Sequence, residues 1–173
     1  RSLELQQQRY LDLDSRILEL SKLENNSLPE GPEEDSVIKD EQEEEKLLYK
    51  NALELFEASR YAEALEIFSQ VIITYPEGIY TPEAYFWSGE LFLAQEFYED
   101  AKLSYAEVFE QFPNHPRAAD SLYKLGEIQR VESNFIDALN YFERVVSLFP
   151  DSGAAQLSKK SLKLIKEESN LID

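Results

Sequence analysis

The carboxy-terminal part of the chain repeats itself with a fixed period. Pro76, Pro113 and Pro150 follow one another at intervals of 37 residues (113 − 76 and 150 − 113). Four more sets of residues keep the same interval and phase: Ala52, Gly89 and Gly126; Tyr61, Tyr98 and Phe135; Ala64, Ala101 and Ala138; Phe68, Tyr105 and Phe142. Five such columns in one phase are not expected by chance. A fixed period in this range predicts a solenoid, in which each unit buries its apolar face against its neighbours.

Each unit is predicted to consist of two helices, joined by a short turn and closed by a second turn. The small residues of the Ala52 and Ala64 columns are expected where two helices cross closely. The Tyr61 column begins the second helix, and the Phe68 column lies two turns later on the same face. The Pro76 column stops the second helix, because proline cannot continue a helix interior.

These columns resemble those of the tetratricopeptide repeat (TPR) family, across residues 46–150. The period of 37 exceeds the family's usual value of about 34, so each turn between units is longer by about three residues. The resemblance implies an all-α fold: a TPR superhelix of three repeats (about 46–78, 82–115 and 119–150) plus a C-terminal capping helix (about 153–169). The lysines expected to make the outer side of that helix hydrophilic are Lys159, Lys160, Lys163 and Lys166.

An N-terminal coiled-coil helix is predicted over residues 1–23, which show a heptad pattern of apolar residues. The seam of this oligomerisation helix consists of Leu3, Gln6, Tyr10, Leu13, Ile17 and Leu20. An ordinary amphipathic helix that packs on its own domain is the alternative. The coiled coil is favoured because the following segment separates this helix from the repeats.

That segment, residues 24–45, is predicted to be an acidic disordered linker. It holds ten acidic residues, from Glu24 to Glu45, against the single base Lys39. Such a composition, with few apolar residues, does not offset the entropy lost on folding. Its last few residues are expected to begin the next helix, where negative charge is favourable.

Composition excludes several function classes. The 17 basic and 35 acidic residues give a net charge of −18, which makes nucleic acid and anionic lipid poor partners. No apolar run approaches the length of about 20 residues that spans a membrane, so no direct membrane insertion is expected. The chain has no Cys and no Met and starts at Arg1. We therefore interpret it as a trimmed fragment whose missing N-terminus could have carried a targeting signal.

An enzyme is not expected, and neither a cofactor nor a metal is predicted. The single histidine, His115, lies in the turn between two repeats and is interpreted as a surface turn residue. No nucleophile elbow accompanies it, and the five glycines are too scattered to form a phosphate-binding loop.

Several local strings resemble one family in particular, the periplasmic Tol-Pal-associated TPR proteins YbgF, also called cell division coordinator CpoB. The strings are RYLDLDSRI, YKNALELFEASRYAEALEIFSQVIITYP, YFWSGELFLAQEFYEDA, FPNHPRAADSLYKLGE and FPDSGAAQLSKKSLK. The chain departs from that family at Ser59 and Glu96, which stand where a turn glycine is usual, and in its more acidic linker.

This resemblance implies a periplasmic protein that forms a homotrimer through its N-terminal helix. It implies that the TPR domain binds TolA, with a bifunctional peptidoglycan synthase as a further partner. The implied role is to coordinate outer-membrane constriction with septal peptidoglycan synthesis during cell division.

The first helices of the repeats are expected to line a concave groove that binds a partner. By repeat phase, the groove residues are Tyr49, Leu53, Phe56, Phe86, Glu90, Leu93, Tyr123, Glu127 and Arg130. The aromatic column Tyr49, Phe86 and Tyr123, with negative charge beside it, favours a peptide or helix that carries apolar anchors and some positive charge. The alternative is that these aromatics pack between repeats, as Trp87 is expected to do.

Two other binding roles compete with this assignment. A TPR scaffold of outer-membrane protein assembly has similar long turns, but generally has more repeats and no leading coiled coil. A cytosolic chaperone co-factor would place basic residues in the groove to hold a C-terminal carboxylate, whereas here only Arg130 is basic.

Overall fold

The computed structural model describes residues 34–169, with side chains for residues 40–167, and this part of the chain consists of helices joined by turns. The helices are α2 (Glu34–Glu57), α3 (Tyr61–Thr74), α4 (Thr81–Ala94), α5 (Tyr98–Gln111), α6 (Arg117–Val131), α7 (Phe135–Leu148) and α8 (Gly153–Ser169). The chain divides into two units, Arg1–Asp40 and Glu41–Asp173. The predicted coiled-coil seam, from Leu3 to Leu20, lies outside the described residues.

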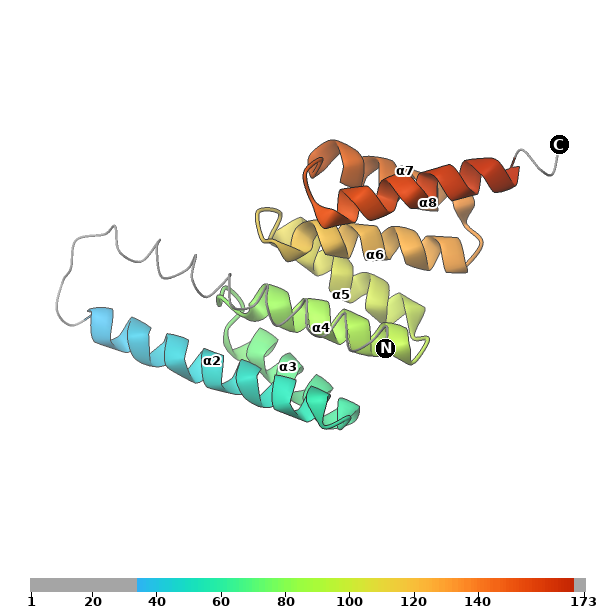
Figure 1. Ribbon diagram of the computed structural model, residues 1–173. Coiled ribbons are helices and arrows are strands. Elements are labelled where there is room, and N and C mark those ends of the chain that lie inside the picture. The colour runs from blue at the N-terminus through green and yellow to red at the C-terminus, as the bar shows by residue number, and fades with distance from the viewer. Residues whose placement is uncertain (1–33, 170–173) are drawn as a thin grey trace. The chain divides into compact units, whose positions relative to one another are not determined.

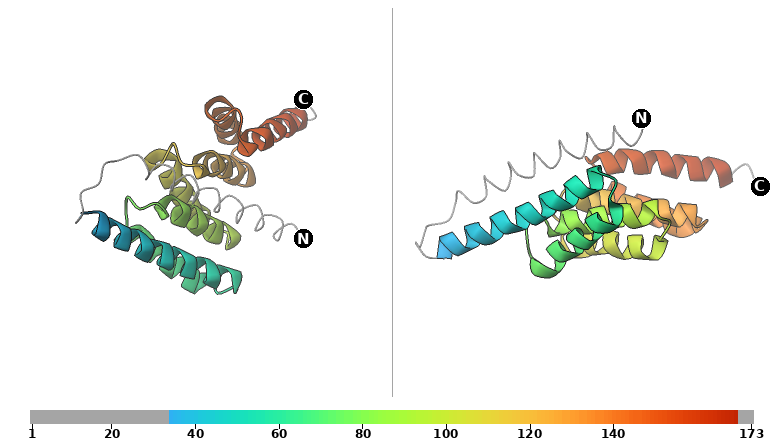
Figure 2. Two further views of the ribbon diagram at one scale, coloured as in Figure 1. Left: turned by 60° about the vertical axis from the view of Figure 1, so that its left-hand side comes forward. Right: turned by 90° about the horizontal axis from the view of Figure 1, so that it is seen from below.

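The second unit is a stack of helix pairs (Figure 1). Each repeat contributes a first helix (α2, α4 or α6) and a second helix (α3, α5 or α7), and α8 is a first helix that packs on α6 and α7. The first helices α4, α6 and α8 also contact one another in order, so successive repeats lie side by side in each view (Figure 2). This arrangement confirms the predicted all-α TPR architecture. Among the described helices, none is long and apolar enough to cross a membrane.

The column residues set the ends of the second helices. Tyr61, Tyr98 and Phe135 are the first residues of α3, α5 and α7, as predicted. Each second helix ends two residues before the proline of its unit. The first helix α4 begins at Thr81, so Pro82 lies in its first turn, where the missing N–H of proline costs nothing.

The small residues of the first helices lie under aromatic rings of the second helices. A Cβ added to Gly89 would lie 2.7 Å from the Tyr105 ring, and one added to Gly126 would lie 2.7 Å from the Phe142 ring. Both rings are fully buried. The absence of a side chain at these two positions therefore lets the two helices of a repeat cross closely, as the sequence predicted.

The turn inside each repeat uses a left-handed residue that is not glycine. Ser59, Glu96 and Ser133, again 37 apart (96 − 59 and 133 − 96), have φ angles of 60°, 62° and 64°. In the first repeat the N–H of Arg60 bonds to the carbonyl of Leu55, and that of Ser59 to Phe56. This is the Schellman pattern that ends a helix, and it repeats in the other two turns.

The helix α2 begins at Glu34, twelve residues before the boundary predicted at Lys46 (46 − 34). The helix was expected to begin only with the last few residues of the linker, so the prediction of a disordered segment was wrong for the residues from Glu34 up to those few. Residues 24–33 lie outside the described part. The Glu45 side chain has a structural role: it is 2% exposed, and its carboxylate accepts hydrogen bonds from the backbone N–H groups of Tyr80 (2.6 Å) and Ile79 (3.1 Å). An acidic composition predicts a solvated segment, but it cannot show that one carboxylate has buried donors to bind.

The first helices α4, α6 and α8 each have a different side chain that accepts hydrogen bonds from backbone N–H groups at the start of the helix. Glu45 is the side chain that does so for α4. The equivalent turn positions are Gly78, His115 and Ser152, at intervals of 37 (115 − 78 and 152 − 115). His115 Nδ1 accepts from the N–H of Arg117 (3.2 Å), and Ser152 Oγ accepts from the N–H of Ala155 (3.0 Å). Gly78 has no side chain, and the Glu45 carboxylate occupies the space, 2.2 Å from where a Cβ would lie. The start of α4 thus receives its cap from the previous repeat.

Candidate functional site

The predicted groove residues do not all lie at the surface. Tyr49 is 4% exposed, and its hydroxyl accepts a hydrogen bond from Trp87 Nε1 (3.2 Å). Its ring stacks on Tyr80, with centroids 4.8 Å apart. Tyr49 is therefore a core residue, and its assignment to the groove surface was wrong. Trp87, predicted to be core, is 4% exposed.

Phe86 is likewise buried, with no exposed surface. The Arg117 guanidinium lies over its ring, 4.6 Å from the centroid, and the Tyr105 ring lies 5.7 Å away, edge on. Its assignment to the groove surface was also wrong.

The junctions between repeats explain both corrections. Tyr80, Arg117 and Ala154 form one column (117 − 80 and 154 − 117) at the start of the next first helix. Tyr80 covers Tyr49 and Arg117 covers Phe86, whereas Ala154 carries no ring or guanidinium to lay over the third aromatic residue. Tyr123 accordingly remains half-buried, with its ring 5.6 Å from Phe142.

Of the apolar residues predicted for the groove, three have half-buried side chains: Leu53, Phe56 and Leu93. The Phe56 ring has two aromatic neighbours, with its centroid 4.9 Å from that of Trp87 and 5.6 Å from that of Tyr61. An aromatic side chain that packs against two other rings is a suitable anchor site for an apolar side chain of a partner.

The acidic residues of the groove are paired. Glu90 Oε1 lies 2.6 Å from Lys124 Nζ and also accepts from the Tyr105 hydroxyl. Glu127 forms an ion pair with Arg130 (3.0 Å) and accepts from Ser161 Oγ (3.3 Å). The acidic residues predicted for the groove therefore have partners that include the bases Lys124 and Arg130, and Lys124 was not among the residues that the repeat phase predicted.

These contacts follow one register along the first helices. Glu90 and Glu127 share a column (127 − 90), and each contacts the next first helix one turn earlier, at Lys124 and Ser161 respectively. Side chains of adjacent first helices thus contact one another across these two junctions between repeats.

A buried ion pair at the second junction was not predicted. Arg117 has no exposed surface, and its Nε lies 2.9 Å from Glu83 Oε2 and 3.0 Å from Oε1. Glu83 is 1% exposed. The two residues lie 34 apart in a repeat of 37, so they belong to different columns. The sequence carried one signal for this ion pair. Arg117 occupies the repeat position that Tyr80, a buried aromatic residue, occupies one repeat earlier.

His115 stands beside this ion pair, and its interpretation as a surface residue was wrong. The side chain is 13% exposed, with Nε2 3.9 Å from Glu83 Oε1. Burial, with a smaller contribution from the Arg117 charge, lowers the pKa of His115 from 6.5 to about 4. The imidazole is therefore neutral near pH 7, and its Nδ1 acts as the acceptor described above.

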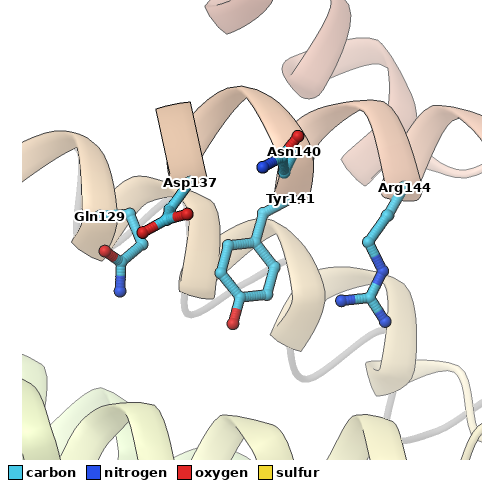
Figure 3. Close-up of a pocket in the computed structure, with 5 residues that line it drawn as sticks. All are labelled: Gln129, Asp137, Asn140, Tyr141 and Arg144. Atoms are coloured by element: carbon cyan, nitrogen blue, oxygen red, sulfur yellow. The ribbon is translucent and has the colours of Figure 1, made fainter. Parts of the chain in front are cut away.

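A separate hollow of about 360 Å³ lies between α6 and α7. Its lining residues are Gln129, Asp137, Asn140, Tyr141 and Arg144, and the side chains of Tyr141 and Arg144 project to the same side of α7 (Figure 3). The Arg144 guanidinium lies 5.0 Å from the centroid of the Phe109 ring. The mixture of one acid, one base and two amides gives this hollow no single charge preference.

The sequence from Tyr49 onward matches the family model of the tetratricopeptide repeat over residues 49–101 and 88–152, more than half of the chain. The chain belongs to the tetratricopeptide repeat family. TPR domains are typically non-catalytic scaffolds for protein interactions. In the part of the chain that the structure describes, no cluster of His, Cys, Asp and Glu could hold a metal ion.

Solved TPR structures resemble the chain at low sequence identity. The Yersinia enterocolitica type III secretion chaperone SycD, in complex with a peptide of the translocator YopD, has a TM-score of 0.62 and 16% identity, covering 72% of this chain and 93% of that one. The first TPR of Spaghetti (RPAP3), bound to the HSP90 peptide SRMEEVD, has a TM-score of 0.59 and 15% identity, covering 75% and 98%. MamA has a TM-score of 0.59 and 19% identity, covering 79% and 75%. No curated protein matches the chain in sequence.

Proposed function

We propose that this TPR protein is a periplasmic adaptor of the Tol-Pal system, whose groove surface binds TolA. In this role it coordinates outer-membrane constriction with septal peptidoglycan synthesis during cell division, with a bifunctional peptidoglycan synthase as a further partner. The proposal rests on the sequence strings that resemble the YbgF and CpoB family, together with a groove surface suited to a peptide.

The observation that carries the binding role is the composition of the groove surface. Leu53 and Phe56 on α2 and Leu93 on α4 offer apolar anchor sites. The ion pair between Glu90 on α4 and Lys124 on α6 supplies charges of both signs. A partner segment with apolar anchors and a few charges of both signs would match this surface. This combination favours specificity, because a misplaced charge would lie against a charge of the same sign.

Two structural relatives support peptide binding by such a surface. SycD was solved with a peptide of YopD, and the Spaghetti domain with the HSP90 peptide SRMEEVD. A peptide on the groove of this chain would bind by the same general mode, with a few side chains supplying most of the affinity.

Affinity for purified TolA, measured by isothermal titration calorimetry, tests the proposal. Leu93→Ser, a change on the groove surface, is expected to weaken binding by about tenfold or more. Leu103→Ser is the matched control, because Leu103 is 67% exposed on the second helix α5. Binding of the control should be unchanged, and both variants should keep the melting temperature of the parent.

Absence of TolA binding by the unmodified chain would overturn the Tol-Pal assignment. Equal weakening by both leucine variants would instead overturn the groove as the binding surface. The trimer is tested separately by light scattering: the full chain should have three times the mass of one copy, and a fragment that begins at Glu41 the mass of one.

A further inference from the structure

The helix α8, red in Figure 1, exposes two leucines that occupy stacking positions of the solenoid. Leu157 and Leu164 lie two turns apart on one face, and they are 46% and 58% exposed. Leu164 stands in the column of Glu90 and Glu127 (164 − 127), which contact the next first helix in each earlier repeat. Leu157 stands in the column of Glu83 (157 − 83 is twice 37), which is buried under Arg117 of the next first helix.

This face therefore has the position of a surface on which another first helix packs. The other open face of α8, where its own second helix would lie, is different. Lys163 stands in the column of Ala52, Gly89 and Gly126 (163 − 126), where only a very small residue fits under a closely crossing helix. An added helix is accommodated on the leucine face and excluded from the lysine face.

The charge of α8 indicates what kind of partner helix fits the leucine face. Four exposed lysines, at 159, 160, 163 and 166, lie on α8, on a chain whose net charge is −18. By helical spacing Lys160 adjoins the leucine face and Lys163 lies further round on the same side, whereas Lys159 and Lys166 lie on the opposite side of the helix. Lys163 has a weak contact with Glu167 (3.7 Å) and Lys166 with Glu143 (4.0 Å). Within the described residues, Lys159 and Lys160 have no ion pair. A local basic field of this kind attracts and orients an acidic partner.

A second copy of α8 fits this face poorly. A symmetric pair of α8 helices would bring the two lysine-rich helices together, with like charges opposed. We propose that the leucine face of α8, formed by Leu157, Lys160 and Leu164, docks an acidic amphipathic helix of a partner protein. That helix lies on α8 as α8 lies on α6. The surface does not include the groove residues of the three repeats, so it is independent of TolA binding.

Fluorescence anisotropy with the full chain and synthetic helical peptides tests this docking surface. The acidic probe carries leucines seven residues apart, flanked by glutamates, and the matched probe carries lysines in place of the glutamates. The acidic probe should bind at least about tenfold more tightly than the basic probe, and more weakly as the salt concentration rises. The double variant Leu157→Ser, Leu164→Ser should weaken binding about tenfold or more, while Leu103→Ser leaves it unchanged.

Three results would overturn the proposal. These are equal binding of the two probes, no binding of the acidic probe, or unchanged binding by the leucine double variant with its helicity and melting temperature intact. A mass in solution that falls in the double variant would assign the face to a second copy, contrary to the proposal. Lys160→Gln, which leaves both leucines in place, should weaken the acidic probe about threefold and separate the charge effect from any effect on packing.

Discussion

The guanidinium of Arg117 lies between the carboxylate of Glu83 and the ring of Phe86. Its Nε is 2.9 Å from Glu83 Oε2, and its Cζ is 4.6 Å from the centroid of the Phe86 ring. Arg117, from the third repeat, thus neutralises Glu83 of the second repeat and covers the ring of Phe86, which lies on the same helix as Glu83. The stability of this junction depends on both contacts.

Removing one partner of this pair should destabilise the protein strongly. Glu83→Gln or Arg117→Met each leaves an uncompensated charge or an unfilled polar site in the interior, and each is expected to cost about 3–5 kcal/mol. The double variant Glu83→Leu, Arg117→Met leaves no buried charge and should cost less than the two single changes together. Urea unfolding followed by circular dichroism gives these free energies.

The exposed pair Lys50–Glu54 is the control for the buried pair. Its atoms are 3.9 Å apart, and the side chains are 70% and 66% exposed. Glu54→Gln should therefore cost less than about 1 kcal/mol. A similar small effect at Glu83 would show that the buried pair contributes no more than a surface pair.

Acidification should destabilise the protein through His115. Its pKa is about 4 in the folded protein, below the ordinary value of 6.5, so folding favours the neutral form. The contribution is complete above pH 6.5 and is lost as the pH falls toward 4, with an upper limit of about 3 kcal/mol. Asparagine can replace Nδ1 as acceptor without titrating. The unfolding free energy of the His115→Asn variant should therefore fall less than that of the parent between pH 7 and pH 4.5.

The comparison with His115→Asn removes the contribution of other groups. Burial raises the pKa of Glu45 and of Asp120, which favours the folded state at lower pH, but this effect is common to both proteins. Parallel curves for parent and variant would contradict the assignment of the pH dependence to His115.

Glycine in the turns within the repeats should stabilise the protein. Glu96 has a φ angle of 62°, a left-handed conformation that costs a side-chain-bearing residue about 1 kcal/mol. Glu96→Gly should raise the free energy of unfolding by about 0.5–1 kcal/mol. Ala94→Gly, two residues earlier in α4, should lower it by a similar amount because it lies in a helix. Thermal melting distinguishes the two directions, and a destabilised Glu96→Gly variant would contradict the argument.

The close helix crossing should make Gly89 intolerant of any side chain. A Cβ there lies 2.7 Å from the Tyr105 ring, so Gly89→Ala is expected to cost about 1–3 kcal/mol. Gly153→Ala is the matched control, since a Cβ at that position meets no atom within 4 Å. The control should change stability by less than about 0.5 kcal/mol. Equal effects at the two positions would mean that the crossing relaxes freely.

The sequence was sufficient to predict the repeat architecture because its signals are local. The aromatic residues Tyr61, Tyr98 and Phe135 mark the starts of the second helices, and the proline column marks their ends. Each such residue acts through its own conformational preference or through a contact inside one repeat. Because these residues recur at a fixed period, the same pair of helices is predicted in each of the three repeats.

The site was less predictable, because burial depends on the next repeat. Tyr49, Phe86 and Tyr123 share one column, yet they differ in burial according to whether Tyr80, Arg117 or Ala154 follows. Periodicity shows which residues share a face but not which side chain covers them. The groove and oligomerisation roles of the remaining residues stay predictions, and the experiments proposed above address them.

The capping of α4 by Glu45 has a consequence for how the repeats can be separated. A fragment cut at Lys46, where the columns suggest that the first repeat begins, would lack Glu45. It would leave the N–H groups of Ile79 and Tyr80 without the acceptor that they have in the intact chain. The cut would therefore loosen the beginning of the second repeat, over 30 residues away in sequence (79 − 45). The first helix of one repeat thus completes the start of the next repeat, and a fragment that keeps this cap must include Glu45.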